Sequence, residues 1–201
     1  MRIDVIDNGG QWTHKEWHVL KSLGVDSEIR PNTISSKSLD DSDGLVLSGG
    51  APSITSELDK LGNVSSFIDD HDFPVLGICV GAQFIALHYG GEVGPGTRPE
   101  YGKTKVDILN KVGIFKEMPD TIIAWENHND EIKRIPPELT LVAKSDNCAV
   151  QAFAHRTLPI YGVQYHPEVN NTEYGRELFI NFINICKERV PDKFKNKSSI
   201  L

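Results

Sequence analysis

Pro74-Val75-Leu76-Gly77-Ile78-Cys79-Val80-Gly81-Ala82-Gln83 is the stretch that decides the fold. It begins as an apolar strand, turns at Gly-x-Cys-x-Gly and continues as a helix that the pattern predicts over residues 80–89. Small residues two positions either side of the cysteine permit a tight strand-to-helix turn, which raises the thiol above the sheet. The positive end of the helix dipole also favours a thiolate there. The pattern therefore predicts a nucleophile elbow carrying Cys79, with a buried core cysteine as the alternative.

Around this stretch, the first half of the chain alternates short apolar runs with helical patterns. Strands are predicted at residues 2–6, 25–29, 44–47 and 74–78, and apolar residues keep helical spacing over 17–23 and 58–68. This alternation is typical of parallel strands joined by right-handed crossovers. We therefore expect a three-layer α/β/α fold with a mostly parallel central sheet.

The second half of the chain changes character. Strand-like runs at residues 103–109, 121–124, 139–143, 148–152 and 160–165 are separated by short loops, and a helical pattern returns at 173–186. We interpret these runs as antiparallel hairpins that extend the first sheet, followed by a closing helix. The prediction is one domain over residues 1–187 and a basic, flexible tail over 188–201.

A nucleophilic cysteine needs a base and a group that orients the base. Tyr161-Gly162-Val163-Gln164-Tyr165-His166-Pro167-Glu168 ends an apolar strand with a histidine, and a glutamate follows two residues later. Residues i and i+2 of an extended segment point the same way, so Glu168 can hold one imidazole nitrogen while the other faces Cys79. The alternative is a histidine at a strand end with a solvated glutamate nearby.

Ser48-Gly49-Gly50 follows the apolar run 44–47. Two glycines let backbone N–H groups approach a substrate oxygen, so Gly49 or Gly50, together with the N–H of Val80, is a candidate oxyanion hole. An ordinary loop is one alternative. The other is the pyrophosphate loop of ATP pyrophosphatases, but Pro52 stands where that loop needs an aspartate.

Composition excludes several classes of protein. Lys and Arg number 21 against 28 Asp and Glu, a net charge of −7, which argues against nucleic-acid or membrane-surface partners. The three cysteines are too few and too scattered for a disulfide framework or a Cys-rich zinc module. We find no membrane-spanning run and no signal peptide, so the expected location is the cytoplasm.

Taken together and in this order, the three motifs resemble those of the triad (class I) glutamine amidotransferases, over about residues 1–187. The resemblance implies hydrolysis of glutamine through a γ-glutamyl thioester and delivery of ammonia to a synthase partner. It assigns catalysis to Cys79, His166 and Glu168 and a glutamine contact to Gln83. It implies no metal or organic cofactor in this chain.

Within that family, three further segments resemble the free-standing amidotransferase subunits of GMP synthetases. These are residues 6–11, Glu100-Tyr101-Gly102 and Trp125-Glu126-Asn127-His128-Asn129-Asp130-Glu131. The resemblance implies a partner ATP pyrophosphatase subunit that binds ATP, Mg²⁺ and XMP. Anthranilate or aminodeoxychorismate synthase subunits and a stand-alone γ-glutamyl hydrolase are the alternatives.

The last of these segments departs from the usual pattern, which has Ser before the histidine and often Gly after it. Asn127, His128 and Asn129 are expected beside the glutamine site, where backbone contacts survive these changes more readily than side-chain roles. The polar run 127–131 is also expected to be an exposed loop that couples partner docking to catalysis.

Overall fold

The computed structural model describes residues 1–189 and contains one nine-stranded sheet. The strand order is β2-β1-β3-β4-β9-β8-β7-β5-β6. In chain order the strands are β1 Ile3–Asp7, β2 Ile29–Pro31, β3 Gly44–Leu47, β4 Val75–Ile78, β5 Glu92–Ile108, β6 Thr121–Arg134, β7 Leu139–Ser145, β8 Ala152–His155 and β9 Ile160–Val163.

The sheet is parallel on one side and antiparallel on the other. Strand β1 pairs in parallel with β2 and β3, β3 with β4, and β4 with β9. From β9 onward every pairing is antiparallel. The expected parallel sheet with an antiparallel extension is confirmed.

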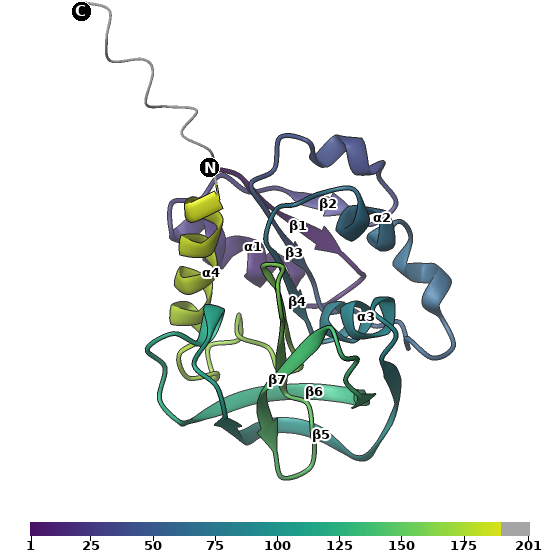
Figure 1. Cartoon of the computed structure of the whole chain (residues 1–201), viewed down its shortest axis with the longest axis vertical. Helices are drawn as coiled ribbons and strands as arrows, with labels where there is room; N and C mark the ends of the chain where they lie inside the picture. The colour runs from purple at the N-terminus through teal and green to yellow at the C-terminus, as the bar shows by residue number, and fades with distance from the viewer. Residues whose placement is uncertain (190–201) are drawn as a thin grey trace, which may run out of the picture.

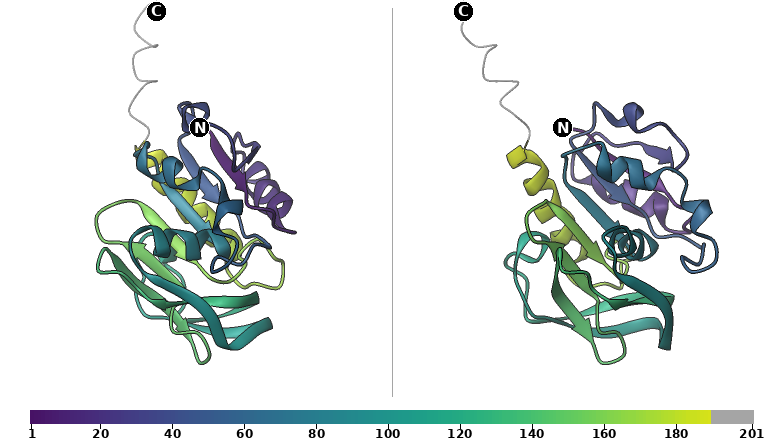
Figure 2. Two further views of the ribbon diagram at one scale, coloured as in Figure 1. Left: turned by 90° about the vertical axis from the view of Figure 1, so that its right-hand side faces the viewer. Right: turned by 45° about the vertical axis from the view of Figure 1, so that its right-hand side comes forward.

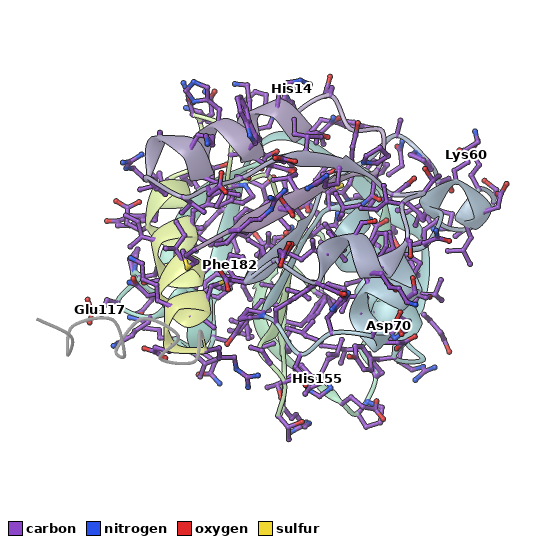
Figure 3. The ribbon with its side chains drawn as sticks, turned by 90° about the horizontal axis from the view of Figure 1, so that it is seen from above. His14, Lys60, Asp70, Glu117, His155 and Phe182 are labelled. Atoms are coloured by element: carbon purple, nitrogen blue, oxygen red, sulfur yellow. The ribbon has the colours of Figure 1, made fainter. Side chains whose placement is uncertain are left out.

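Helices cover both faces of the parallel part, as Figures 1 and 2 show. Helices α1 (Thr13–Ser22) and α4 (Gly175–Arg189) pack in one apolar core, and α2 (Val64–Asp69) and α3 (Val80–His88) pack in the other. Figure 3 shows Phe182 of α4 turned toward the sheet, where it is fully buried. The three-layer α/β/α prediction is therefore confirmed, with both cores formed by apolar faces of these helices.

Several element predictions were wrong in detail. Residues 148–152 were predicted as a strand, but the chain turns there: the Ser145 and Cys148 backbones pair, and β8 starts only at Ala152. The strand predicted at 25–29 is shifted to 29–31. The helical pattern over 58–68 is divided into a 3₁₀ turn (Leu58–Leu61) and α2, because Gly62 between them has a φ of +58°.

The predicted domain boundary at residue 187 falls inside α4, which continues to Arg189. Most of the predicted tail, residues 190–201, lies outside the described residues. None of the helices in residues 1–189 combines the length and apolar character needed to cross a membrane.

Candidate active site

Cys79 occupies the turn between β4 and α3 with φ 51° and ψ −111°. A non-glycine residue in this left-handed region is strained by about 1–3 kcal/mol, and such strain concentrates at functional sites. The Cys79 N–H donates to Val163 O at 2.8 Å, and Gln83 N–H donates to Cys79 O at 2.9 Å. The elbow is thus held from the neighbouring strand β9 and from the first turn of α3.

The glycines either side of Cys79 are required by close backbone packing. A Cβ on Gly81 would lie 2.2 Å from the carbonyl oxygen of Leu47, and one on Gly77 would lie 2.7 Å from the Gly81 carbonyl. No larger residue fits either position without moving the backbone. The Gly-x-Cys-x-Gly pattern has its physical cause in these two contacts.

His166 lies three residues beyond the end of β9, which is the neighbour of the nucleophile strand β4. His166 Nδ1–H donates to Glu168 Oε1 at 2.7 Å, and both side chains are buried. The backbone of His166 is fixed by a hydrogen bond from its N–H to Trp125 O and one from Thr172 Oγ1 to its carbonyl. The histidine–glutamate pair expected from the sequence is present in the structure.

The second ring nitrogen of His166 faces Cys79. Burial alone would lower the pKa of His166, but the charge of Glu168 and hydrogen bonds with Cys79 and Glu168 outweigh it, and the pKa lies well above its ordinary value. Gln164 Nε2 lies 3.6 Å from Cys79 Sγ on the same side. The imidazolium form of His166 is therefore favoured beside Cys79. In this form His166 can donate a proton to a leaving group.

The loop after β3 passes over Cys79 and His166. A Cβ on Gly49 would lie 3.0 Å from His166 Cε1 and 3.6 Å from Cys79 Cβ. Gly49 N–H donates to Glu16 Oε1 at 3.3 Å, whereas the N–H groups of Gly50 and Val80 have no acceptor within residues 1–189. Of the two glycines, Gly50 is the one whose amide is available to a substrate oxygen.

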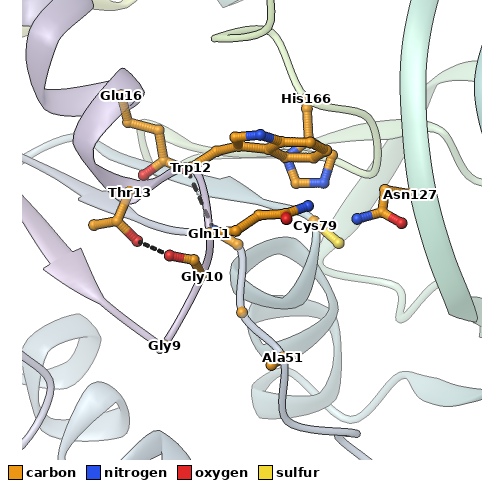
Figure 4. Close-up of a pocket in the computed structure, with 12 residues that line it drawn as sticks. Gly9, Gly10, Gln11, Trp12, Thr13, Glu16, Ala51, Cys79, Asn127 and His166 are labelled. Carbon is orange, nitrogen blue, oxygen red and sulfur yellow. Dashed lines mark hydrogen bonds between the residues drawn. The ribbon is translucent and has the colours of Figure 1, made fainter.

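Two cavities meet at Cys79. The first, the Gln83 cavity, has a volume of about 420 Å³ and is lined by Gly50, Ala51, Pro52, Ser53, Cys79, Val80, Gln83, Asn127, His128, Asn129 and Asp130. The second, the Trp12 cavity, has a volume of about 370 Å³ and is lined by Gly9, Gly10, Gln11, Trp12, Thr13, Glu16, Gly49, Gly50, Ala51, Cys79, Asn127 and His166 (Figure 4). The Gln83 cavity is large enough for an amino acid, and His166 lines only the Trp12 cavity.

Gln83 is buried in the wall of the cavity named after it. Its Nε2 donates to Asp130 O at 2.7 Å and to Gln164 Oε1 at 3.1 Å. Asn129 accepts a hydrogen bond from the Tyr101 hydroxyl at 2.6 Å, and Asn127 lines both cavities. Gln83 therefore ties α3 to β6 and to the segment that precedes His166.

The expectation of an exposed loop at 127–131 is wrong. These residues lie within β6, paired with β5, and the His128 side chain is buried. His128 Nε2 faces Glu100 at 3.1 Å and Glu126 at 3.4 Å, and its Nδ1 faces Asp130 O at 3.0 Å. Burial opposes protonation, yet the two carboxylates raise the pKa of His128 to about 10. His128 can be buried because two carboxylates face it.

Glu100, His128 and Cys148 are the described residues whose ligand atoms come close enough together to suggest a metal site. Ser145 Oγ and Gln151 Nε2 already donate to Glu100, at 2.8 and 2.7 Å. Burial raises the pKa of Cys148, which opposes the thiolate that a metal requires. The arrangement fits a buried ion-pair network better than a metal centre.

Sequence reasoning missed several residues that line the site, among them Trp12 and Glu16. Trp12 packs edge-on against His166, with ring centroids 4.4 Å apart. Glu16 is buried on α1 between Thr13 and Leu20 on the inward face of that helix. The sequence did contain a sign of Glu16: it is a charged residue at an inward-facing position of a helix. Burying an isolated carboxylate is costly, so such a residue is a candidate for a functional site.

Comparison with known proteins bears on this geometry. The sequence profile of the family described as "Glutamine amidotransferase class-I" matches residues 4–186. The chain is 57% identical to one subunit of the glutamine-hydrolysing GMP synthase of Thermoplasma volcanium, over 98% of this chain and 99% of that protein. It is 60% identical to the protein of the same name from Thermoplasma acidophilum, over 92% and 93%. A crystal structure of a putative GMP synthase subunit from T. acidophilum superposes with a TM-score of 0.90 at 59% identity, covering 94% of each chain.

Proposed function

The chain belongs to the class I glutamine amidotransferase family, and from this premise we propose that it is the glutamine-hydrolysing subunit of a GMP synthase. It hydrolyses glutamine to glutamate and ammonia and passes the ammonia to a separate subunit. The observation that supports this best is the elbow cysteine beside a buried histidine–glutamate pair. The relatives' shared name favours this function over the anthranilate and aminodeoxychorismate synthase alternatives.

In the first half-reaction, the Cys79 proton already lies on His166, and the Cys79 thiolate attacks the γ-amide carbon of glutamine. The carbonyl oxygen becomes an oxyanion, which receives hydrogen bonds from the N–H groups of Gly50 and Val80. His166 then returns the proton to the amide nitrogen as the C–N bond breaks. The products are ammonia and a γ-glutamyl thioester on Cys79.

In the second half-reaction, neutral His166 takes a proton from water, and the resulting hydroxide attacks the thioester carbon. The C–S bond breaks, glutamate leaves, and Cys79 and His166 return to their starting protonation states. Glu168 acts throughout by fixing the tautomer of His166 and by stabilising the imidazolium.

In this proposal one cavity binds glutamine and the other receives the released ammonia. Glutamine occupies the Gln83 cavity, with its amino-acid end near Asn127, His128 and Asn129. The leaving nitrogen must lie within reach of His166, which lines the Trp12 cavity. Ammonia is therefore released on the Trp12 side of Cys79.

We propose that the receiving partner is an ATP pyrophosphatase subunit that binds ATP and Mg²⁺ and activates XMP. The nucleotide chemistry belongs to that subunit, and the residues of this chain supply only ammonia. Both subunits are proposed to work in the cytoplasm, in keeping with three free cysteines in this chain.

The test uses the complex of both subunits with ATP, Mg²⁺ and XMP. GMP formation is measured with glutamine and, separately, with ammonium chloride as the nitrogen source. Cys79→Ala should abolish the glutamine-dependent reaction and leave the ammonium-dependent one intact. Glutamine-dependent synthesis that survives in Cys79→Ala would refute the proposed function.

A further inference from the structure

Glu16 brings a carboxyl group into the active site that the reaction described above does not use. Its side chain is 1% exposed and lines the Trp12 cavity together with Cys79 and His166 (Figure 4). Oε1 accepts the Gly49 N–H at 3.3 Å, and Oε2 has no hydrogen-bond partner among residues 1–189. Burying a carboxyl group costs free energy unless it is hydrogen-bonded, and the one hydrogen bond of Glu16 within residues 1–189 is with the oxyanion loop.

Hydrogen bonds hold both the N–H and the carbonyl group of Gly49. Glu16 accepts its N–H, and the Ser48 hydroxyl donates to its carbonyl oxygen at 2.8 Å. The Gly49 carbonyl and the Gly50 N–H belong to one trans peptide, so they point in opposite directions. Fixing Gly49 therefore fixes the direction of the Gly50 N–H above Cys79.

Ser48 is itself anchored by the segment that leads into α1. Asn8 N–H donates to Ser48 Oγ at 3.0 Å, and Asn8 Nδ2 donates to Ser48 O at 2.9 Å. Thr13, which also lines the Trp12 cavity, donates from Oγ1 to Ser48 Oγ at 3.3 Å. Both anchors of Gly49 thus depend on residues 8–16, and among those residues it is the Glu16 side chain that hydrogen-bonds Gly49 itself.

The protonation state of Glu16 decides which substitution preserves its hydrogen bond with Gly49. Burial, and then the negative charge of Glu168, raise the pKa of Glu16 well above its ordinary value. A neutral carboxylic acid offers a carbonyl oxygen to Gly49 without placing a second negative charge beside the triad. Glutamine offers the same oxygen in the same shape.

We propose that Glu16 is a positioning residue for the oxyanion hole, whose carboxyl oxygen holds Gly49 so that the Gly50 N–H points at the oxygen of the substrate. Glu16 does not touch the reacting atoms and acts through the loop. This rests on the proposed function, because an oxyanion forms only if glutamine is attacked by Cys79.

The experiment compares Glu16→Gln, which keeps the acceptor, with Glu16→Met, which removes it at similar volume. Lys21→Ala, at the far end of the same helix, is the control. In the complex with ATP and XMP, Glu16→Met should lower kcat for glutamine by roughly 10- to 100-fold with little change in KM, somewhat less than the loss of an oxyanion donor outright. Glu16→Gln should stay within about twofold of wild type, and ammonium-dependent synthesis should be unchanged in both.

A second readout separates loop position from general damage. Alkylation of Cys79 by iodoacetamide displaces iodide and forms no oxyanion, so its rate should be the same in Glu16→Met and wild type. Binding of a γ-glutamyl aldehyde, which forms a tetrahedral adduct with Cys79, should weaken by about the factor lost in kcat. Should Glu16→Met not fold, Glu16→Ala is measured in the same way.

Wild-type kcat in Glu16→Met would overturn the positioning role. Glu16→Gln as impaired as Glu16→Met would also overturn it, because an acceptor would then not be what matters. Neither result touches the proposed function, which is decided separately by Cys79→Ala.

Discussion

At the scale of single residues, Cys79 differs from the other two cysteines in backbone and surroundings. It sits at a strained turn and lines both cavities. Cys148 and Cys186 are buried, and burial raises the pKa of each thiol. The thiolate is the reactive form, so the three residues should differ sharply in reactivity.

A glutamine-like chloroketone or diazo analogue should therefore alkylate Cys79 alone. The measurement is mass spectrometry of peptides after partial labelling, with excess glutamine as the control that protects Cys79. Labelling spread evenly over the three cysteines would contradict the assignment of the elbow.

The substitution Glu168→Gln tests whether Glu168 orients His166. The amide keeps the shape of the side chain but stabilises the imidazolium poorly and favours the wrong tautomer of His166, so glutamine-dependent synthesis should fall by up to about 10⁴-fold. Ammonium-dependent synthesis should persist, because in the proposed function that chemistry belongs to the partner. If both activities disappeared together, Glu168 would have a structural or interface role instead.

At the scale of elements, β4 and β9 are parallel neighbours whose carboxyl ends deliver Cys79 and His166 to one place. The elbow depends on Gly81, where α3 crosses close to β3. On the antiparallel side, β5 and β6 bury the charged cluster of Glu100, Glu126 and His128 behind the Gln83 cavity. Helix α3 contributes Gln83 and strand β6 contributes His128 to the lining of the Gln83 cavity.

Gly81→Ala should destabilise the fold by about 1–3 kcal/mol, the usual cost of overpacking, because the new methyl group would meet the Leu47 carbonyl oxygen. Gly94→Ala is the matched control, since its methyl group would lie no closer than 3.8 Å to Lys133. Urea unfolding measures both free energies. Equal free energies of unfolding in the two variants would show that the α3–β3 contact is not tight.

His128→Gln should cost about 3–5 kcal/mol of unfolding free energy at neutral pH, because it leaves buried carboxylates without their cation. The folded pKa of about 10 lies above the ordinary 6.5, so the ion-pair stabilisation is fully present below about pH 6.5 and is lost as pH rises through 10. Wild-type stability should therefore decline across that window relative to the variant. Parallel pH curves for the two proteins would contradict a protonated His128.

The elements that the sequence predicted well are those with a local signal. The glycines around Cys79 and the apolar run before His166 predict a turn and a strand without any knowledge of the fold. The burial of His128 could not be predicted, because its partner Glu100 lies on another strand and a run of polar residues alone indicates exposure. Glu16 was missed for a similar reason, since its contact with Gly49 depends on α1 crossing the end of β3.

At the scale of the whole molecule, strand β6 connects helix α3 with the loop that follows β3. The Asp130 carboxylate accepts a hydrogen bond from Ser53 beyond the oxyanion loop at 2.8 Å, and its carbonyl accepts one from Gln83 on α3 at 2.7 Å. A partner that shifts β6 would move both walls of the Gln83 cavity. We therefore expect docking to change the rate of glutamine hydrolysis.

Adding the partner subunit with ATP and XMP should raise glutaminase turnover roughly 5- to 150-fold, the range of ordinary coupling energies. Asp130→Ala should reduce this activation, because it removes the link to Ser53. Glutamate release is measured with and without the partner, and equal turnover in both conditions would exclude coupling.

The adjacency of β4 and β9 also has a consequence for biosynthesis of the enzyme. Strands β5 to β8 lie between them in the chain, so the ribosome makes Cys79 long before His166. Translation proceeds at about 5–20 residues per second, which leaves the nucleophile without its base for several seconds. A nascent or truncated chain therefore carries a thiol but no glutaminase, and no glutamine is consumed until the last strand has been threaded between β4 and β8.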